Sequence, residues 1–443
     1  MNDDGLLLTD LYQLTMLQSY FEQGMNDIAV FEFFVRKLPP GRNFLIAGGL
    51  EQVVEFLARA HFSTTELEWL ASCGRFRKGF VDSLADWRFS GAVDAMPEGT
   101  VFFPDEPILR VVAPLREAQL VETRLINLLQ FQTMVASKAV RCVLAAEERR
   151  LIDFGLRRAH GSEAGLLSAR ASYLAGFAGT ATVLAGMRWN IPLFGTMAHS
   201  YIQAHDREQD AFEHFARTYP AGTTLLVDTY DTDIAVRQLV SLAQRLQHEG
   251  ITIGAVRIDS GDLRAHAANV RRILDAGQLP HVAIIASGNL DEYKIRDLVA
   301  ADAPIDSFGV GTRMNTSADA PFLDCAYKLQ EYAGRPRRKR SIGKATWPGR
   351  KQVWRAYGAD GRMLFDTLSL QHDRAEGEAL LQPVTVGGQR VAELPALPAI
   401  RDRARDQLRQ LPQPLLELEA APAHPVQVSR SLHDLARKLD CGA

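Results

Sequence analysis

Four short segments in the middle of the chain combine polar side chains with glycines in a pattern that suits phosphate binding. They are residues 228–231, 257–262, 287–289 and 309–312. Glycines beside hydroxyl groups let backbone N–H groups approach a phosphate, and neighbouring carboxylates can hold Mg²⁺ through water or accept ribose hydroxyls. One such loop alone is more often a turn with a helix cap. Four in succession favour a phosphorylated substrate.

Two histidines are candidates for proton or phosphoryl transfer. His199 lies in the segment GTMAHS after a short apolar run, and His160 follows Arg157 and Arg158. An imidazole at a strand end can be a general base, a metal ligand or a phosphoryl acceptor. A structural role is the default for any one of the eleven histidines. His199 is favoured because it follows a predicted strand, as the glycine-containing segments do. The paired arginines beside His160 could bind an anion through two hydrogen bonds each.

The elements that must position these residues alternate between strand and helix. Apolar runs at 225–228, 253–258, 282–285 and 305–310 predict strands, and helical patterns follow the first three. Such units argue for a parallel sheet, either doubly wound or closed into a barrel. We favour a barrel, because the polar residues and glycines collect at the carboxyl ends of the strands, where barrel enzymes carry their chemistry.

The rest of the chain does not alternate regularly between predicted strands and helices. Patterns before residue 150 predict a strand at 29–38, a helix at 45–60, a small β unit at 89–112 and a long helical bridge at 117–147. After residue 325 the alternation stops. We therefore divide the chain into an N-terminal α/β domain with the bridging helix, a barrel domain carrying the active site, and a basic hairpin with a C-terminal region. The expected bounds are 1–135, 136–325 and 326–443.

Composition and charge limit the partners. The 443 residues are 47% hydrophobic and 23% charged, as in soluble globular proteins. A net charge of −3 gives no global reason to bind nucleic acid or a membrane, and the start lacks the order of a signal peptide. The basic segment 335–351 contains a single aromatic residue, Trp347. Such a segment suits binding of a polyphosphate or a dimer surface better than binding of nucleic acid. Four cysteines without metal or redox spacing fit the cytoplasm.

Seven blocks in order along the chain resemble nicotinate phosphoribosyltransferases. They are LTDLYQLTM at 8–16, DFGLRRAHG at 153–161, GTMAHS at 195–200, VDTYDT at 227–232, RIDSGD at 257–262, GVGT at 309–312 and KATWPGRKQ at 344–352. The resemblance implies an irregular, TIM-like α/β barrel beside an N-terminal α/β sandwich-like domain, with a C-terminal extension. It implies ligase-type, ATP-coupled synthesis of nicotinate mononucleotide from nicotinate and 5-phosphoribosyl 1-diphosphate. A homodimer with shared active sites is implied as well.

The resemblance also assigns roles to single residues. His199 would take a phosphoryl group from ATP. Asp259 would be the second catalytic residue and would lie at the ribose hydroxyls. Tyr12 of a neighbouring subunit and Phe154 would cover the two faces of the pyridine ring. The other assigned residues would surround the carboxylate and diphosphate (Arg157, Thr196, Arg257) or hold the 5′-phosphate (Ser287, Gly288, Gly309, Val310, Gly311, Thr312). Mg²⁺ would serve the leaving group, without an assigned protein ligand.

Ala181 separates the nearest alternatives. Nicotinamide phosphoribosyltransferases are similar at residues 179–183 but carry an aspartate where Ala181 stands, and that carboxylate would repel nicotinate. A barrel isomerase or lyase acting on a sugar phosphate is a second rival, but it leaves the block around Tyr12 unexplained. A nucleotide sensor is a third, and the presence of His199 with Arg157 and Arg257 argues against it.

Overall fold

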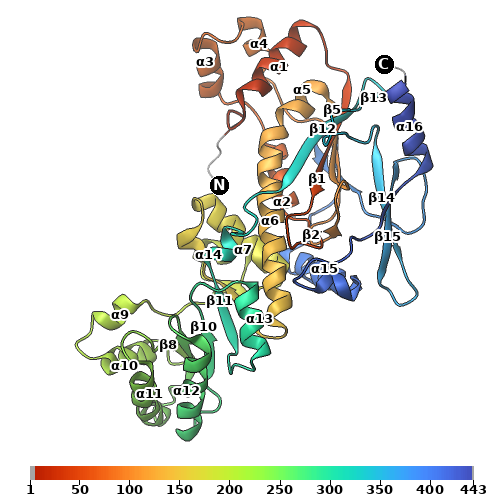
Figure 1. Ribbon diagram of the computed structural model, residues 1–443. Coiled ribbons are helices and arrows are strands. Elements are labelled where there is room, and N and C mark those ends of the chain that lie inside the picture. The colour runs from red at the N-terminus through yellow and green to blue at the C-terminus, as the bar shows by residue number, and fades with distance from the viewer. Residues whose placement is uncertain (1–4, 442–443) are drawn as a thin grey trace. The chain divides into compact units, whose positions relative to one another are not determined.

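The computed structural model describes residues 5–441, which form two compact units of mixed α/β structure (Figure 1). The terminal unit holds the residues up to 137 and from 322 onward, and the central unit holds residues 138–321. Among the described helices, none combines the length and the apolar character that a membrane span requires. The three-part division expected from the sequence stays a prediction.

A seven-stranded sheet forms the core of the terminal unit. Its order is β13-β12-β1-β5-β3-β17-β18, and β1 pairs antiparallel with both β12 and β5. Residues 29–35 of β1 are all buried, as their Val- and Phe-rich sequence requires, so the predicted strand is confirmed. The strands are β1 (Ile28–Lys37), β3 (Ala92–Ala95), β5 (Pro107–Pro114), β12 (Asp324–Tyr332), β13 (Arg335–Pro336), β17 (Gln382–Val386) and β18 (Gln389–Arg390).

Two smaller sheets and several helices complete this unit. The sheets are β2 (Leu45–Ile46) with β4 (Val101–Phe102), and β16 (Glu378–Ala379), β14 (Lys351–Tyr357), β15 (Met363–Leu370) and β19 (Val426–Val428). The helices are α1 (Leu11–Glu22), α2 (Leu50–Arg59), α3 (Thr64–Ser72), α4 (Lys78–Asp82), α5 (Leu115–Leu120), α15 (Leu397–Gln410), α16 (Arg430–Cys441) and the 3₁₀ helix η2 (Gln413–Leu416). The predicted bridge at 117–147 is present as the end of α5 and α6 (Glu122–Ala146), which crosses the boundary between the units.

The predicted helix at 45–60 is wrong in its first turn. Leu45 and Ile46 pair with β4, and the helix α2 begins only at Leu50. Gly49 stands between them with a φ of +99°, a conformation that helical residues do not adopt. A Cβ at Gly49 would also lie 2.7 Å from the carbonyl oxygen of Leu128, so a larger residue does not fit.

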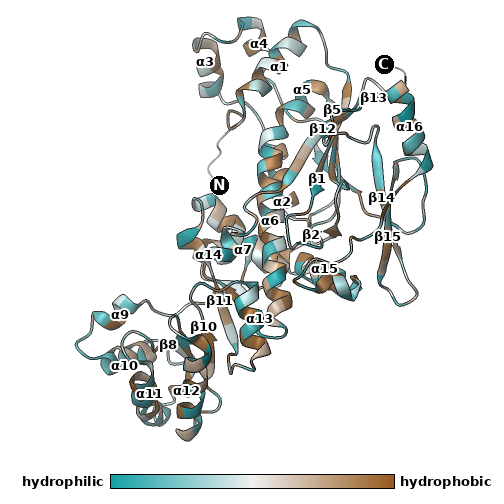
Figure 2. Cartoon of the chain, in the orientation of Figure 1, coloured by the Kyte–Doolittle hydropathy of each residue, from teal (hydrophilic) through white to brown (hydrophobic). Residues whose placement is uncertain are grey.

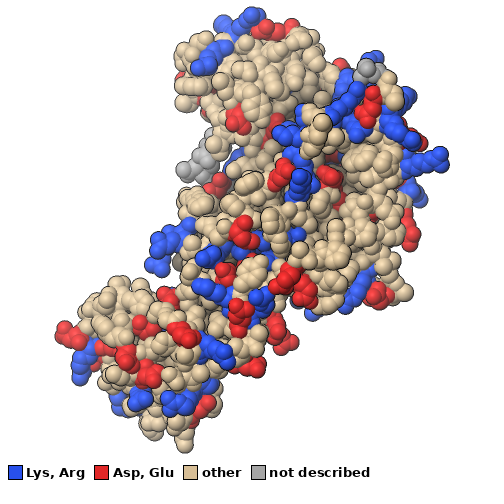
Figure 3. Space-filling view, viewed as in Figure 1, with Lys and Arg blue, Asp and Glu red and all other residues tan. Residues whose placement is uncertain are grey.

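The basic segment 335–351 forms little regular structure. It begins as β13, the short return strand of a hairpin with β12, and it ends at the first residue of β14. Between these strands Arg338 and Arg340 form ion pairs with Asp440 on α16. Lys and Arg side chains gather on this part of the terminal unit (Figure 3).

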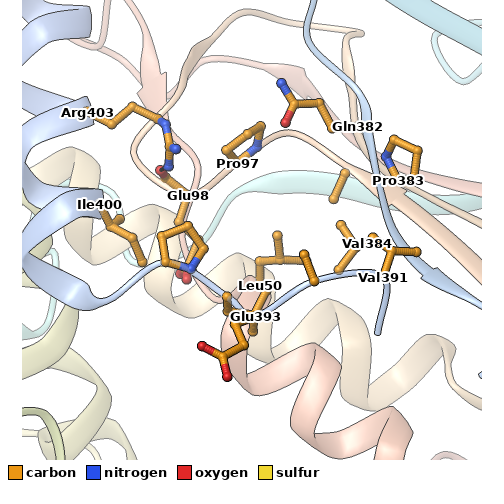
Figure 4. Close-up of a pocket in the computed structure, with 14 residues that line it drawn as sticks. Leu50, Pro97, Glu98, Gln382, Pro383, Val384, Val391, Glu393, Ile400 and Arg403 are labelled. Atoms are coloured by element: carbon orange, nitrogen blue, oxygen red, sulfur yellow. Dashed lines mark hydrogen bonds between the residues drawn. The ribbon is translucent and has the colours of Figure 1, made fainter. Parts of the chain in front are cut away.

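The terminal unit also contains a cavity of about 200 Å³ (Figure 4). Its wall is largely apolar and includes Leu50, Val384 and Ile400, with Glu98 and Arg403 at one end. Glu98 accepts a hydrogen bond from the backbone N–H of Gly49 at 2.6 Å and thereby caps α2. The Glu98 backbone oxygen accepts a hydrogen bond from Arg403 Nη1 at 3.1 Å. Glu98 and Arg403 therefore have structural partners, and Glu393 is the third charged residue of the wall.

A six-stranded parallel sheet forms the core of the central unit, in the order β7-β6-β11-β10-β9-β8. The four predicted strands are confirmed within two residues at each end as β8 (Thr223–Leu226), β9 (Ile253–Ile258), β10 (Ala283–Ala286) and β11 (Ser307–Val310). The other strands are β6 (Arg150–Asp153) and β7 (Gly179–Thr180).

Helices follow the first three predicted strands as expected, and further helices follow the other strands of the sheet. They are η1 (Leu156–Arg158), α7 (Ser162–Ala175), α8 (Val183–Trp189), α9 (His199–Gln203), α10 (Glu208–Thr218), α11 (Thr232–Gln247), α12 (Leu263–Ala276), α13 (Glu292–Ala300) and α14 (Thr312–Asn315). The neighbouring helices α11 and α12 carry both hydrophobic and hydrophilic residues (Figure 2). The residues of α11 at helical spacing, such as Val236, Leu239 and Leu246, are the buried ones.

The parallel sheet makes half of a barrel, and its closure is not seen in the described residues. β7 and β8 are the two edges of the sheet, and they do not pair with each other. The segment after β7 forms α8 and adds no further strand to this edge. Its one pairing with the sheet is an isolated bridge between Leu193 and Thr180. The polar strand ends therefore lie along one edge of a half-barrel.

Candidate active site

A cavity of about 590 Å³ lies at the carboxyl ends of β6, β7, β8 and β9 in the central unit. Apolar side chains such as Leu193 and Met197 form part of its wall. The parallel strands place their carboxyl ends at one edge, so residues from different loops meet there. Among the wall residues are seven that the sequence singled out: Phe154, Arg157, Ala181, Thr196, His199, Arg257 and Asp259.

Arg257 connects three of the loops. Its Nε donates to Ser287 Oγ and its Nη2 donates to Asp259 Oδ1, each at 2.8 Å, and Ser287 Oγ also donates to Asp259. The guanidinium carbon lies 5.3 Å from the ring centroid of Phe154, which is a cation–π distance. Within the described chain the hydrogen bonds of Arg257 use Nε and Nη2, so the N–H groups of Nη1 are available to an anion.

His199 begins α9 and stands on the same cavity. Its Nδ1 lies 3.1 Å from Thr229 Oγ1, and its Nε2 lies 4.0 Å from Asp259 Oδ2. The side chain is 41% exposed, so a ligand can reach it. Thr229 therefore holds Nδ1, and Nε2 is the ring nitrogen on the side of Asp259. His160, the rival, is exposed and does not line the cavity.

Asp228, at the end of β8, holds the loop after β9. Its Oδ2 accepts from the backbone N–H of Asp259 at 2.8 Å and from Ser260 Oγ at 2.6 Å. Its Oδ1 is buried and has no hydrogen-bond partner in the described chain. The described residues contain no group of three His, Cys, Asp or Glu side chains that could hold a metal.

The glycine loops expected around a phosphate lie at the same edge, and two of their glycines have steric reasons to be glycine. Gly288 has a φ of +101°, and a Cβ there would lie 2.1 Å from the backbone oxygen of Asp259. Gly309 lies inside β11 against Phe154, whose ring a Cβ would approach to 2.5 Å. Val310 is fully buried, and Gly311 and Thr312 form the start of α14.

A second cavity of about 580 Å³ shares Asp259 with the first. Gly288 and Asn289 form part of its wall, together with the cations Arg264 and Lys294. Its wall also includes the carboxylates of Asp259, Asp262 and Asp297, and the N-termini of α12 and α13 begin beside it. This polar cavity extends the site away from the apolar wall of the first cavity.

Two other expected site residues have different settings. Thr196 Oγ1 donates to the backbone oxygen of Thr224 at 2.5 Å and so ties the segment before His199 to β8. Tyr12 belongs to the terminal unit, where it is 47% exposed on α1. Burial, followed by the carboxylates of Glu122 and Asp10, raises the pKa of Tyr12, so its hydroxyl stays protonated at neutral pH.

Sequence reasoning missed two residues that position this site. Thr229 lies in the quoted block at 227–232, but no sequence signal connects it with His199, thirty residues earlier. Asp153 opens another quoted block and lies buried beneath the loop that carries Phe154 and Arg157.

Family models cover most of the chain in three parts. They describe the nicotinate phosphoribosyltransferase (NAPRTase) N-terminal domain at residues 7–130, the NAPRTase family at 149–334 and the C-terminal domain at 371–436. The chain belongs to the nicotinate phosphoribosyltransferase family. This confirms the resemblance found in the seven blocks.

Individual members of the family are similar over most of their length. A nicotinate phosphoribosyltransferase of Mycobacterium tuberculosis is 49% identical over 98% of this chain and 94% of its own. One from Bacillus subtilis is 39% identical over 80% of this chain and 74% of its own. The human nicotinic acid phosphoribosyltransferase structure matches with a TM-score of 0.88 at 29% identity, covering 97% of this chain and 99% of its own.

Proposed function

We propose that this nicotinate phosphoribosyltransferase family member joins nicotinate to 5-phosphoribosyl 1-diphosphate, giving nicotinate mononucleotide and diphosphate in NAD salvage, with ATP as a co-substrate. The observation that carries the proposal is the single cavity in which Phe154, Arg257, Asp259 and His199 meet. An aromatic ring, a cation, a carboxylate and a nucleophile are the groups this reaction needs. The relatives' names support the same substrates.

The proposed transfer joins two anions at a cationic carbon. Phe154 stacks on the pyridine ring, while Arg157 and Arg257 hold the nicotinate carboxylate and the diphosphate. The pyridine nitrogen forms the new bond to the anomeric carbon as the C–O bond breaks, and diphosphate leaves with the electron pair. Asp259 stabilises positive charge that develops on the ribose. The loops at Ser287–Gly288 and residues 309–312 hold the 5′-phosphate at the strand ends.

In the proposed ATP-coupled step, His199 accepts the terminal phosphoryl group. Nε2 forms the N–P bond as the bond to the ADP oxygen breaks, while Thr229 holds Nδ1. Mg²⁺ prefers oxygen ligands and keeps several waters, so it would be held mainly by the phosphate oxygens of the substrates and by water. When bound, it neutralises charge on the departing diphosphate.

Ala181 on the cavity wall supports nicotinate over nicotinamide as the substrate. An aspartate at this place could accept a hydrogen bond from the amide of nicotinamide, but it would repel the carboxylate of nicotinate. Alanine avoids that repulsion. Synthesis from nicotinamide is therefore the second candidate.

Assembly, location and barrel closure are further parts of the proposal. Leu8, Leu11 and Tyr12 are exposed apolar residues close together in the sequence, which supports a homodimer whose partner supplies the second ring face. All four cysteines are free, which supports a cytoplasmic location. The bridge between Thr180 and Leu193 supports an irregular barrel built on the half-barrel sheet.

The proposed function is tested by incubating the protein with 5-phosphoribosyl 1-diphosphate and Mg²⁺, with nicotinate or nicotinamide, and with or without ATP. Mass spectrometry identifies the mononucleotide formed. We expect nicotinate mononucleotide, in larger amount when ATP is present. Formation of nicotinamide mononucleotide alone would select the second candidate, and the absence of any mononucleotide would refute both.

A further inference from the structure

Asp153 is a buried carboxylate directly beneath the candidate site. It is the last residue of β6, it precedes Phe154, and it is 0% exposed. In the described part of the chain its carboxylate has no cationic partner. It accepts two hydrogen bonds instead, Oδ1 from the backbone N–H of Gly155 and Oδ2 from Thr180 Oγ1, each at 2.8 Å.

These hydrogen bonds join two turns that form walls of the cavity. Thr180 Oγ1, which donates to Asp153, also accepts from the backbone N–H of Thr182 at 3.0 Å. The backbone N–H of Ala181 donates to the backbone oxygen of Asp153 at 2.9 Å. One side chain therefore links the turn behind Phe154 to the turn that carries Ala181.

Such a carboxylate is expensive to bury. Burial raises the pKa of Asp153, and interactions with Thr180, the backbone of Gly155 and the side chain of Asn315 lower it, which partly offsets the burial. A buried charge without a cation costs stability that an apolar residue of similar size would not cost. Stability alone therefore does not explain the choice of aspartate here.

We propose that Asp153 is a positioning residue for the ring subsite: its two acceptor oxygens set the distance between Phe154 and the wall at Ala181. This inference rests on the proposed function, because the ring held there is that of nicotinate. His199 is positioned separately, by Thr229 and the loops after β8 and β9. The carboxylate is thus expected to affect nicotinate binding and not phosphoryl transfer to His199.

The isosteric change Asp153→Asn removes one of the two acceptors. The asparagine oxygen can still accept from Gly155 N–H, but its amide then donates to Thr180 Oγ1. That oxygen already accepts from Thr182, so the hydroxyl proton of Thr180 loses its acceptor. Without this hydrogen bond the two turns are held less firmly, and we expect nicotinate binding to weaken by about tenfold, the scale of one hydrogen bond to a charged group.

The test compares Asp153→Asn, Thr180→Val and the double variant by steady-state kinetics and by labelling with γ-labelled ATP. We expect each single variant to raise the KM for nicotinate by about tenfold, with labelling within about twofold of the native protein. The double variant should be no worse than either single variant, since both break the same contact. Thr180→Ser, which keeps the hydroxyl, should restore a near-native KM.

Asp306→Asn makes the same substitution at an exposed aspartate away from the cavity and serves as the control. Asp306 Oδ2 accepts from the backbone N–H of Ile284 at 2.7 Å at the opposite, amino-terminal end of the same sheet. This variant should leave the KM for nicotinate unchanged.

Three results would overturn the inference while the native protein remains active: an unchanged KM for nicotinate, additive effects in the double variant, or an equal loss of labelling. If Asp153→Asn yields no folded protein, Thr180→Val and Thr180→Ser decide by the same criterion. A native protein that makes no nicotinate mononucleotide would refute the proposed function and this inference together.

Discussion

Glu208 provides a pH-dependent test of the electrostatics beside the site. It is the first residue of α10, and its Oε1 is buried without a hydrogen-bond partner in the described chain. Burial, followed by the carboxylates of Asp231 and Asp228, raises the pKa of Glu208 to about 7. Replacing Glu208 by Gln removes the titrating charge and keeps the shape of the side chain.

The sign of the effect follows from proton linkage. Between pH of about 4.5 and 7 the folded protein holds a proton on Glu208 that the unfolded chain has already released. This group therefore lowers the free energy of unfolding as pH rises through that window, and its full destabilisation is present above pH 7. Glu208→Gln should be more stable than the native protein at pH 8, and the difference should shrink as pH falls toward about 4.5.

The expected gain in the free energy of unfolding is well below the value that the whole pKa rise would give. Each pKa unit corresponds to about 1.36 kcal/mol, so the whole rise would amount to about 3.4 kcal/mol. Glu208 is only half-buried, so solvent screening reduces this figure substantially. The N-terminus of α10 also favours a negative charge by about 0.3–1 kcal/mol. We expect a gain of roughly 1 kcal/mol in the free energy of unfolding at pH 8.

Urea unfolding of both proteins between pH 5 and 8 measures this difference. Asp210→Asn is the control on the same helix turn: its hydrogen bond with Arg207 lowers the pKa of Asp210, so its contribution has the opposite sign. That stabilisation is present above the pKa of the unfolded chain and is lost as pH falls through the lower folded value. Parallel native and Glu208→Gln curves across the whole range would refute the electrostatic reasoning.

Three further predictions concern the proposed reaction. His199→Asn should abolish acid-labile labelling by γ-labelled ATP and leave weak ATP-independent synthesis; equal labelling, or its loss in His160→Asn instead, would contradict the assignment. Ala181→Asp should weaken nicotinate use by about tenfold or more, about 1.4 kcal/mol for an added like charge; equal or better use of nicotinamide by the native protein would count against this. Mixed Tyr12→Ala and His199→Ala chains should recover part of the activity, because one site of the hybrid dimer would be intact. No recovery after demonstrated subunit exchange would show that each site is built from one chain.

Local patterns predicted the central unit well because its elements carry strong periodic signals. The strand expected at 253–258 is β9, Ile253–Ile258, and the helix expected after it is α12. The error at residues 45–49 has a different origin. Helical spacing continues backward from Leu50, but Leu45 and Ile46 pair with a strand more than fifty residues away, which local spacing does not reveal.

Long-range geometry also decides how far the sheet closes. Polar strand ends are compatible with a barrel and with an open parallel sheet, since both place the carboxyl ends at one edge. Residues 191–198 contribute only the bridge between Leu193 and Thr180, so the described sheet ends at β7. The number of strands in the sheet depends on these pairings, and the local pattern of apolar and polar residues does not reveal them.

The sequence by itself determined the chemical inventory of the site: which strand ends carry Arg257, Asp259 and the glycine loops, and which histidine lies in the same type of position. Only the tertiary structure decided which of these groups touch. Adjacent strand residues face opposite sides, so Arg257 and Asp259 reach the cavity while Ile258 is buried between them. The contacts of Arg257 with Phe154 and of His199 with Thr229 depend on strand register and loop packing. A shift of one residue in that register would turn the same side chains away from the cavity.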